Sequence, residues 1–102
     1  MTKHWLPIRY RDFYDVPRAV VVEFKRELFL FDSLFDADLD EYESFYAVYR
    51  LPGELRHEID GMSWTDLGQR GTRLGSVDVA AVEFDSTRRR AINESVFENL
   101  GV

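Results

Sequence analysis

The segment FDSLFDADLDEYESFY (31–46) holds the side chains that most readily suggest chemistry. It contains no lysine or arginine and carries six carboxylates: Asp32, Asp36, Asp38, Asp40, Glu41 and Glu43. The alternating aspartates from Asp36 to Asp40 have the spacing of the first ligands in an EF-hand calcium loop. That loop also needs a glycine where Glu41 stands and a glutamate where Ala47 stands, so the sequence excludes an EF-hand. A looser carboxylate site for a divalent cation, in an enzyme or a small-molecule-binding domain, remains the alternative hypothesis.

Aromatic residues alternate with these carboxylates, and this combination favours protein recognition. Aromatic side chains supply buried anchors at interfaces, and carboxylates steer a basic partner toward them. The sequence therefore predicts a partner-binding surface within residues 27–49. The residues expected to form it are Phe35, Asp36, Asp38, Asp40, Glu41, Tyr42 and Tyr46. The competing interpretation is a solvated connection whose charges protect a hydrophobic sheet edge from aggregation.

Two groups of arginines form a second candidate site. The glycine-rich segment GQRGTRLG (68–75) lacks the phosphate-loop pattern, but its glycines and arginines could hold an anion. The anion-binding residues predicted on this hypothesis are Arg70, Arg73, Arg88 and Arg89. A solvated loop, or arginines that pair with the acidic segment, is the stronger interpretation.

Other routes to catalysis find little support in the residue types. The chain has no cysteine, which excludes disulfides, thiolate metal sites and thiol nucleophiles. No serine lies in a G-x-S-x-G motif. His57 adjoins Glu58, but in a strand the two side chains would point to opposite faces. We therefore assign no catalytic residue, no metal ligand and no cofactor, and favour a protein that is not an enzyme.

The net charge of −6 is concentrated in one part of the 102-residue chain. Residues 27–49 hold seven acidic groups and no basic ones, whereas acidic and basic groups nearly balance elsewhere. An acidic protein of this kind repels the nucleic-acid backbone, so we expect no nucleic-acid partner. The N-terminus lacks the apolar stretch of a signal peptide, and no run approaches the roughly eighteen apolar residues of a membrane span. The sequence thus predicts a soluble, cytoplasmic protein that does not bind membranes.

Three segments have the composition of strong β-strands. AVVVEF (19–24) and ELFLF (27–31) are rich in β-branched and aromatic residues, and they predict a hairpin with Lys25 and Arg26 at its tip. SFYAVYRL (44–51) predicts a third strand, which Pro52-Gly53 ends. The second and third strands are apolar on both faces, so we expect them to be central in a sandwich or barrel, or to lie in an interface.

The remaining segments give weaker patterns. Residues 7–14 alternate as a half-exposed strand that the proline of Val16-Pro17 should break, and residues 55–59 alternate as a short outer strand. Ser63 should cap one helical turn. Residues 76–85 predict a strand with a bulge at Ala80-Ala81. Near the C-terminus we expect a return strand over 89–93 and a short helix starting at Ser95, where Glu98 would complete a capping box.

The predicted architecture is mainly β, of the α+β class. We expect one domain over residues 1–102, with a strongly bent antiparallel sheet or small barrel of five to seven strands and one or two short helices. The predicted function is non-enzymatic protein interaction through residues 27–49, as in small acidic inhibitor or immunity-like proteins. The partner would be another protein, basic in charge, or a second copy in a homodimer.

Overall fold

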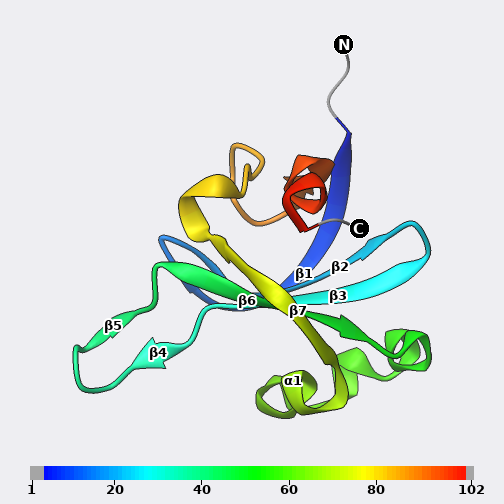
Figure 1. Cartoon of the computed structure of the whole chain (residues 1–102), viewed down its shortest axis with the longest axis horizontal. Coiled ribbons are helices and arrows are strands. Elements are labelled where there is room, and N and C mark those ends of the chain that lie inside the picture. The colour runs from blue at the N-terminus through cyan, green and yellow to red at the C-terminus, as the bar shows by residue number, and fades with distance from the viewer. Residues whose placement is uncertain (1–3, 101–102) are drawn as a thin grey trace.

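The computed structural model describes residues 4–100, which form an open antiparallel sheet and a separate small hairpin (Figure 1). The six strands of the sheet lie in the order β7-β6-β3-β2-β1-β8. Their bounds are β1 (Trp5–Tyr14), β2 (Val16–Phe24), β3 (Glu27–Asp32), β6 (Phe45–Leu51), β7 (Thr72–Asp78) and β8 (Ala91–Asn93). The mainly β prediction is confirmed. The sheet does not close on itself, so the barrel alternative does not hold.

Both faces of the central strands are buried. Phe29 and Phe31 of β3 pack on one face, in a cluster that includes Phe97 of the 3₁₀ helix η5 (Glu94–Leu100). Leu28 and Leu30 pack on the opposite face. That face is covered by η1 (Gly53–His57), η2 (Ile59–Gly61), η3 (Trp64–Asp66) and the short helix α1 (Leu67–Arg70). Figure 1 shows η5 and α1 on opposite sides of the sheet, so the prediction that β3 and β6 are central is confirmed.

The β2–β3 hairpin turns at Lys25 and Arg26, as predicted. Their φ angles of 51° and 67° are both in the left-handed region, as in a type I′ turn. The β1–β2 hairpin turns at Asp15, whose φ is 65°. The first strand ends at Tyr14, as predicted, but Pro17 does not cause the break. Pro17 is the second residue of β2, and a missing amide donor is tolerated at a strand start.

Residues 55–59 are not the outer strand that their alternation predicts. They lie in η1 and η2, and both Leu55 and Ile59 are fully buried beneath the sheet. Leu55 and Ile59 belong to two successive 3₁₀ helices and His57 between them is exposed, so the apolar spacing did not mark one face of a strand.

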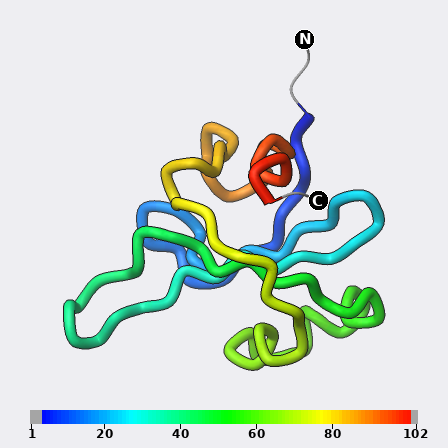
Figure 2. Tube along the Cα trace, viewed as in Figure 1, coloured from blue at the N-terminus to red at the C-terminus, as the bar shows by residue number. Residues whose placement is uncertain are grey.

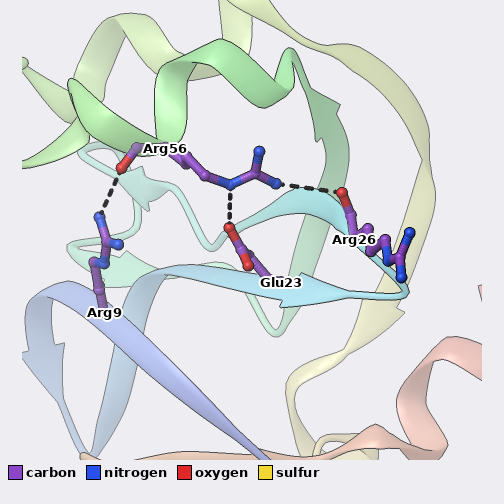
Figure 3. A network of polar contacts seen from close by, with 4 residues as sticks. All are labelled: Arg9, Glu23, Arg26 and Arg56. Carbon is purple, nitrogen blue, oxygen red and sulfur yellow. Dashed lines mark hydrogen bonds and ion pairs between the residues drawn. The ribbon is translucent and has the colours of Figure 1, made fainter.

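Polar contacts of Arg56 fasten this 3₁₀ layer to the sheet (Figure 3). Arg56 Nε donates to Glu23 Oε1 in β2, and Nη2 donates to the carbonyl oxygen of Arg26, 3.2 Å away. The carbonyl of Arg56 accepts a bond from Arg9 Nη1 at 3.4 Å, and Arg9 also lies 3.7 Å from Asp60 Oδ1. These arginines are therefore engaged in holding the fold together.

The helical turn expected after Ser63 is present as η3, but the Ser63 side chain does not cap it. Its hydroxyl instead lies 2.8 Å from Thr65 Oγ1. Ser95 likewise is not the cap of the C-terminal helix, since its amide donates to Asn93 Oδ1 and η5 already begins at Glu94. The return strand before it is β8, which confirms the predicted order of strand and helix.

The expected bulge at Ala80-Ala81 is replaced by the 3₁₀ helix η4 (Val79–Ala81). The register shift lies earlier, where Val48 pairs with Gly75 and Tyr49 with Arg73. Val77 and Val82 nevertheless pack in the same cluster, so a helical turn, in place of a bulge, brings both side chains to one face of the sheet. Within residues 4–100, no helix is long and apolar enough to cross a membrane.

Candidate interaction surface: an acidic arm and the groove at its base

The acidic segment forms a two-stranded arm that projects from the sheet (Figure 2). We define the arm as residues 33–44, which contain β4 (Phe35–Asp36) and β5 (Glu41–Tyr42). The strands pair Phe35 with Tyr42 and Asp36 with Glu41, and the amide of Glu43 donates to the carbonyl of Leu34 at 2.9 Å. The arm therefore has its own backbone pairing and does not extend the main sheet.

Asp36 shapes the tip of the arm. Its Oδ1 accepts hydrogen bonds from the amides of Asp38 at 3.0 Å and Leu39 at 3.3 Å. Asp40 adopts a φ of 55°, a left-handed conformation that Asp tolerates better than most residues. The aspartates at alternate positions thus form a tight turn, and Asp36 has a structural task in it.

The arm exposes apolar side chains beside its carboxylates. The exposed fractions are 53% for Leu34, 51% for Phe35 and 66% for Leu39. Tyr14 of β1 is 63% exposed, and its ring lies 5.8 Å from that of Tyr42, which in turn lies 5.1 Å from Phe35. The rings of Tyr14, Tyr42 and Phe35 form an aromatic strip that runs from β1 onto the arm.

The carboxylates of the arm do not pair with arginines, contrary to the internal pairing that we weighed for Arg70, Arg73, Arg88 and Arg89. Among residues 4–100, the ion pairs join Arg9 to Asp60, Arg50 to Glu27 and Arg56 to Glu23. None of these involves a carboxylate of the arm, so the negative charge of the arm faces solvent.

A buried polar contact fixes the base of the arm. Ser33, almost fully buried, donates from its hydroxyl to the carbonyl of Glu43 at 2.9 Å and accepts from Arg18 Nη1 at 3.3 Å. Arg18 Nε donates to the carbonyl of Tyr14, and its guanidinium lies 4.8 Å from the centre of the Tyr42 ring. Arg18 and Ser33 could not be recognised from the sequence as residues that support the arm, because the residues that they join are distant in sequence.

A groove of about 420 Å³ lies where the arm meets the sheet. The residues that concern its chemistry are Arg11, Asp12, Asp32, Phe35, Tyr42 and Trp64, which we call the groove residues. Partial burial raises the pKa of Asp32 above its ordinary value, and the negative charges of Asp12 and Glu43 raise it further. Arg11 stacks on Trp64, with its guanidinium carbon 5.2 Å from the ring centre.

Tyr46 does not belong to the surface, so its assignment to partner binding is corrected. Its side chain is fully buried in the core, and its hydroxyl donates to the carbonyl of Pro17 at 2.6 Å. Burial raises the pKa of the Tyr46 phenol, although the charge of Arg18 acts in the opposite direction. The spacing of aromatics in the sequence could not reveal that Tyr46 points inward from β6.

The four arginines proposed for an anion site are not brought together. Arg70 ends α1 and Arg73 lies in β7, whereas Arg88 and Arg89 lie in the loop before β8, on the other side of the sheet (Figure 1). Arg88 Nη1 donates to the carbonyl of Asp15, and Arg89 Nη1 donates to the Tyr10 hydroxyl.

Asp85 organises the loop that carries Arg88 and Arg89. Its carboxylate accepts bonds from the Thr87 side chain and from the amides of Thr87, Arg90 and Ala91. Burial opposes the ionisation of Asp85, but these hydrogen bonds outweigh it and hold the pKa of the carboxyl well below its usual range. This carboxylate is therefore occupied by its own loop.

Over residues 4–100, no group of three or more His, Asp or Glu side chains is placed to hold a metal ion. No model of a protein family, no curated protein and no solved structure matches this chain. The case for a function therefore depends on the arm and the groove themselves.

Proposed function

We propose that this protein is a protein-binding module whose arm docks a basic, amphipathic segment of another protein. The observation that carries the proposal is that one protruding hairpin holds both carboxylates without ion pairs among residues 4–100 and the exposed apolar side chains of Leu34, Phe35 and Leu39. Apolar anchors supply affinity, and charges around them supply orientation and a fast association rate.

The charge of the arm favours a basic partner over a second copy of this chain. Each copy carries a net charge of −6, with most of the excess on or near the arm. Two arms brought face to face would repel each other, whereas a lysine-bearing or arginine-bearing segment would be attracted.

The backbone of the arm also supports this choice. Among residues 4–100, β4 and β5 pair only with each other, so within this part of the chain the outer edge of each strand is free to accept a further strand. A partner that adds as an extended strand presents alternate side chains to the two faces, with basic and apolar residues separated. The expected ligand is thus an extended segment in which basic and apolar residues alternate.

The test uses a fluorescently labelled peptide of alternating lysine and leucine, whose binding is measured by fluorescence anisotropy. The variant Asp38→Asn, Asp40→Asn, Glu41→Gln should bind it about three- to a hundredfold more weakly, because each of the three exposed ion pairs contributes about 0.2–1 kcal/mol. Binding by the unmodified protein should weaken as salt is raised. Phe35→Ala should also weaken binding, by about tenfold, since it removes an apolar anchor.

The matched control is Glu54→Gln, Glu58→Gln, Glu98→Gln, which removes the same charge from exposed positions outside the arm. This control should bind the peptide as the unmodified protein does. Equal weakening in both triple variants would show that only net charge matters and would overturn the proposal. A peptide of alternating glutamate and leucine should not bind. A dimer in sedimentation that the arm substitutions abolish would also contradict the proposal.

A further inference from the structure

The groove at the base of the arm has a shape that follows from its strand register. Arg11, Ala19, Asp32 and Ala47 lie opposite one another on four neighbouring strands, β1, β2, β3 and β6. The two alanines flank Asp32 and are too small to fill the space beside it. The hollow of about 420 Å³ is bounded on its other sides by Trp64 and by residues of the arm.

The carboxylates of the groove have no cationic partner among the described residues. Asp12 and Asp32 are absent from the ion pairs within residues 4–100. Burial raises the pKa of Asp32, and the negative charges of Asp12 and Glu43 raise it further. A cation placed between Asp12 and Asp32 would relieve the repulsion between their charges.

The aromatic walls of the groove already hold guanidinium groups. Arg11 stacks on Trp64, and Arg18 stacks on Tyr42 at 4.8 Å. Trp64 is fixed in place because its Nε1 donates to the carbonyl of Ile59 at 3.1 Å. Both rings therefore sit in positions where cation–π attraction to a planar cation operates.

The charges that face the groove leave it negative. Two carboxylates, Asp12 and Asp32, line the groove together with one guanidinium, that of Arg11. Arg18 stacks on Tyr42 and Glu43 acts on Asp32, but neither lines the groove. The two arginines are held over the rings, and neither forms an ion pair with the carboxylates. The unmatched negative charge is thus available to a ligand.

We propose that this groove binds an arginine side chain of the partner that docks on the arm. The guanidinium would receive hydrogen bonds and charge from Asp12 and Asp32, while Phe35 and Trp64 contact its aliphatic stem. Phe35 and Tyr42 belong to both the groove and the arm, so an arginine in the groove is continuous with a segment lying on the arm. The inference rests on the proposed function and names the residue that the partner must supply.

The test uses a capped tripeptide, N-acetyl-Gly-Arg-Gly-amide, followed by two-dimensional ¹H–¹⁵N NMR. Saturable shifts are expected for the Trp64 indole N–H and for the amides near Asp12 and Asp32. The same tripeptide with citrulline, which has the shape of arginine without its charge, should bind at least about tenfold more weakly, because hydrogen bonds to charged groups are the strong ones. Asp32→Asn should weaken arginine binding by a similar factor.

The matched control is Glu98→Gln, an exposed position on η5 that does not line the groove, which should leave the shifts of the tripeptide unchanged. Equal shifts with arginine and citrulline, unchanged binding by Asp32→Asn, or no shift at 20 mM tripeptide (roughly the weak limit for one charged contact) would overturn the inference. The experiment does not involve the tip carboxylates. If the tripeptide does not bind the groove but the lysine–leucine peptide still distinguishes the arm variants, the inference fails and the proposed function stands. If the tripeptide binds but the peptide does not distinguish the arm variants, the proposed function fails and the arginine site in the groove stands by itself.

Discussion

Asp32 is a carboxylate in a position where ionisation is unfavourable. Burial, Asp12 and Glu43 all raise its pKa above the ordinary value of 3.8. The folded protein therefore holds the proton more tightly than the unfolded chain, and stability falls as pH rises through the raised pKa. A charged residue that lowers the stability of the fold at neutral pH is expected at a site where the charge binds a ligand.

The substitution Asp32→Asn should therefore raise the free energy of unfolding at pH 7. The gain should disappear as the pH is lowered toward 3.8, where the native carboxyl is also protonated. Urea denaturation at several pH values measures it, with Asp38→Asn as the exposed control that changes little. A loss of stability in Asp32→Asn at neutral pH would contradict this account.

Tyr46 represents the opposite case, a polar group used by the fold alone. Tyr46→Phe removes the donor to the buried carbonyl of Pro17, and we expect a loss of about 1–3 kcal/mol in the free energy of unfolding. Denaturant unfolding measures the loss, while binding of the lysine–leucine peptide should be unchanged. Tyr14→Phe, at an exposed position, should change stability by no more than about 0.5 kcal/mol. A Tyr46→Phe variant as stable as Tyr14→Phe would show that the bond adds nothing.

The identity of these side chains was predictable from the sequence, but their direction was not. Tyr42 and Tyr46 both belong to the same acidic segment, yet one lies on the arm and the other in the core. The difference arises because β6 begins between them and sets which side of the sheet each later residue faces. Arg18, which supports the arm, could be recognised only once Ser33 and Tyr42 were placed beside it.

At the scale of the elements, the β2–β3 turn combines a favourable shape with an unfavourable sequence. Lys25 and Arg26 both adopt positive φ, and side chains with a Cβ are disfavoured there. Lys25→Asn with Arg26→Gly should stabilise the protein by about 1 kcal/mol, because Asn-Gly is the preferred type I′ pair. The carbonyl of residue 26 that accepts from Arg56 is retained in this variant.

Thermal unfolding measures this effect, and about 1 kcal/mol corresponds to a rise of about 4–8 °C for a domain of this size. The double variant Lys25→Ala, Arg26→Ala keeps the strained backbone and should show no such rise. An equal gain in both variants would attribute the effect to the charges and not to the backbone.

The central strands could be predicted from residue composition, but the short elements around them could not. The two-faced apolar strands were identifiable because a central strand needs apolar residues at every position. Residues 55–59 were mispredicted because the alternation is short: Leu55 and Ile59 are buried in two successive 3₁₀ helices, and His57 between them is exposed. In the arm, two-residue strands are too short to leave a periodic pattern, so their pairing could not be predicted from the sequence.

At the scale of the whole molecule, the arm and the folded body are separable. The longest dimension is 43 Å, against 29 and 24 Å for the others, and Figure 2 shows the arm at one end. Neither of the two buried clusters includes a residue between Leu34 and Ser44. The stability of the body therefore depends little on the arm.

Replacing residues 35–42 by Asn-Gly should leave a cooperatively folded protein. Leu34 and Glu43 are already hydrogen-bonded across the base, so two residues suffice to close the chain. We expect the free energy of unfolding to change by no more than about 1 kcal/mol, a shorter maximum dimension by small-angle X-ray scattering, and no binding of the lysine–leucine peptide. Loss of cooperative unfolding would show that the arm contributes to the core after all.

The concentration of negative charge in one window was evident from the sequence, but the location of the positive charge was not. Arg70 and Arg88 are separated by the sheet because α1 and the loop before β8 pack on its opposite faces. Such separation follows from the order of the strands, and strand order depends on long-range pairing that local patterns do not encode.

The backbone bond between Leu34 and Glu43 has a consequence for how this protein can change over time. The pairing of Asp32 with Ala47 and the hydrogen bond between Glu43 and Leu34 fix the register of β3 and β6 before the arm begins. Residues beyond that closure can be lengthened, shortened or replaced without altering any strand of the sheet. The arm is therefore a site at which binding specificity can diverge rapidly among descendants of this chain, and at which a foreign recognition hairpin can be grafted while the scaffold is left as it is.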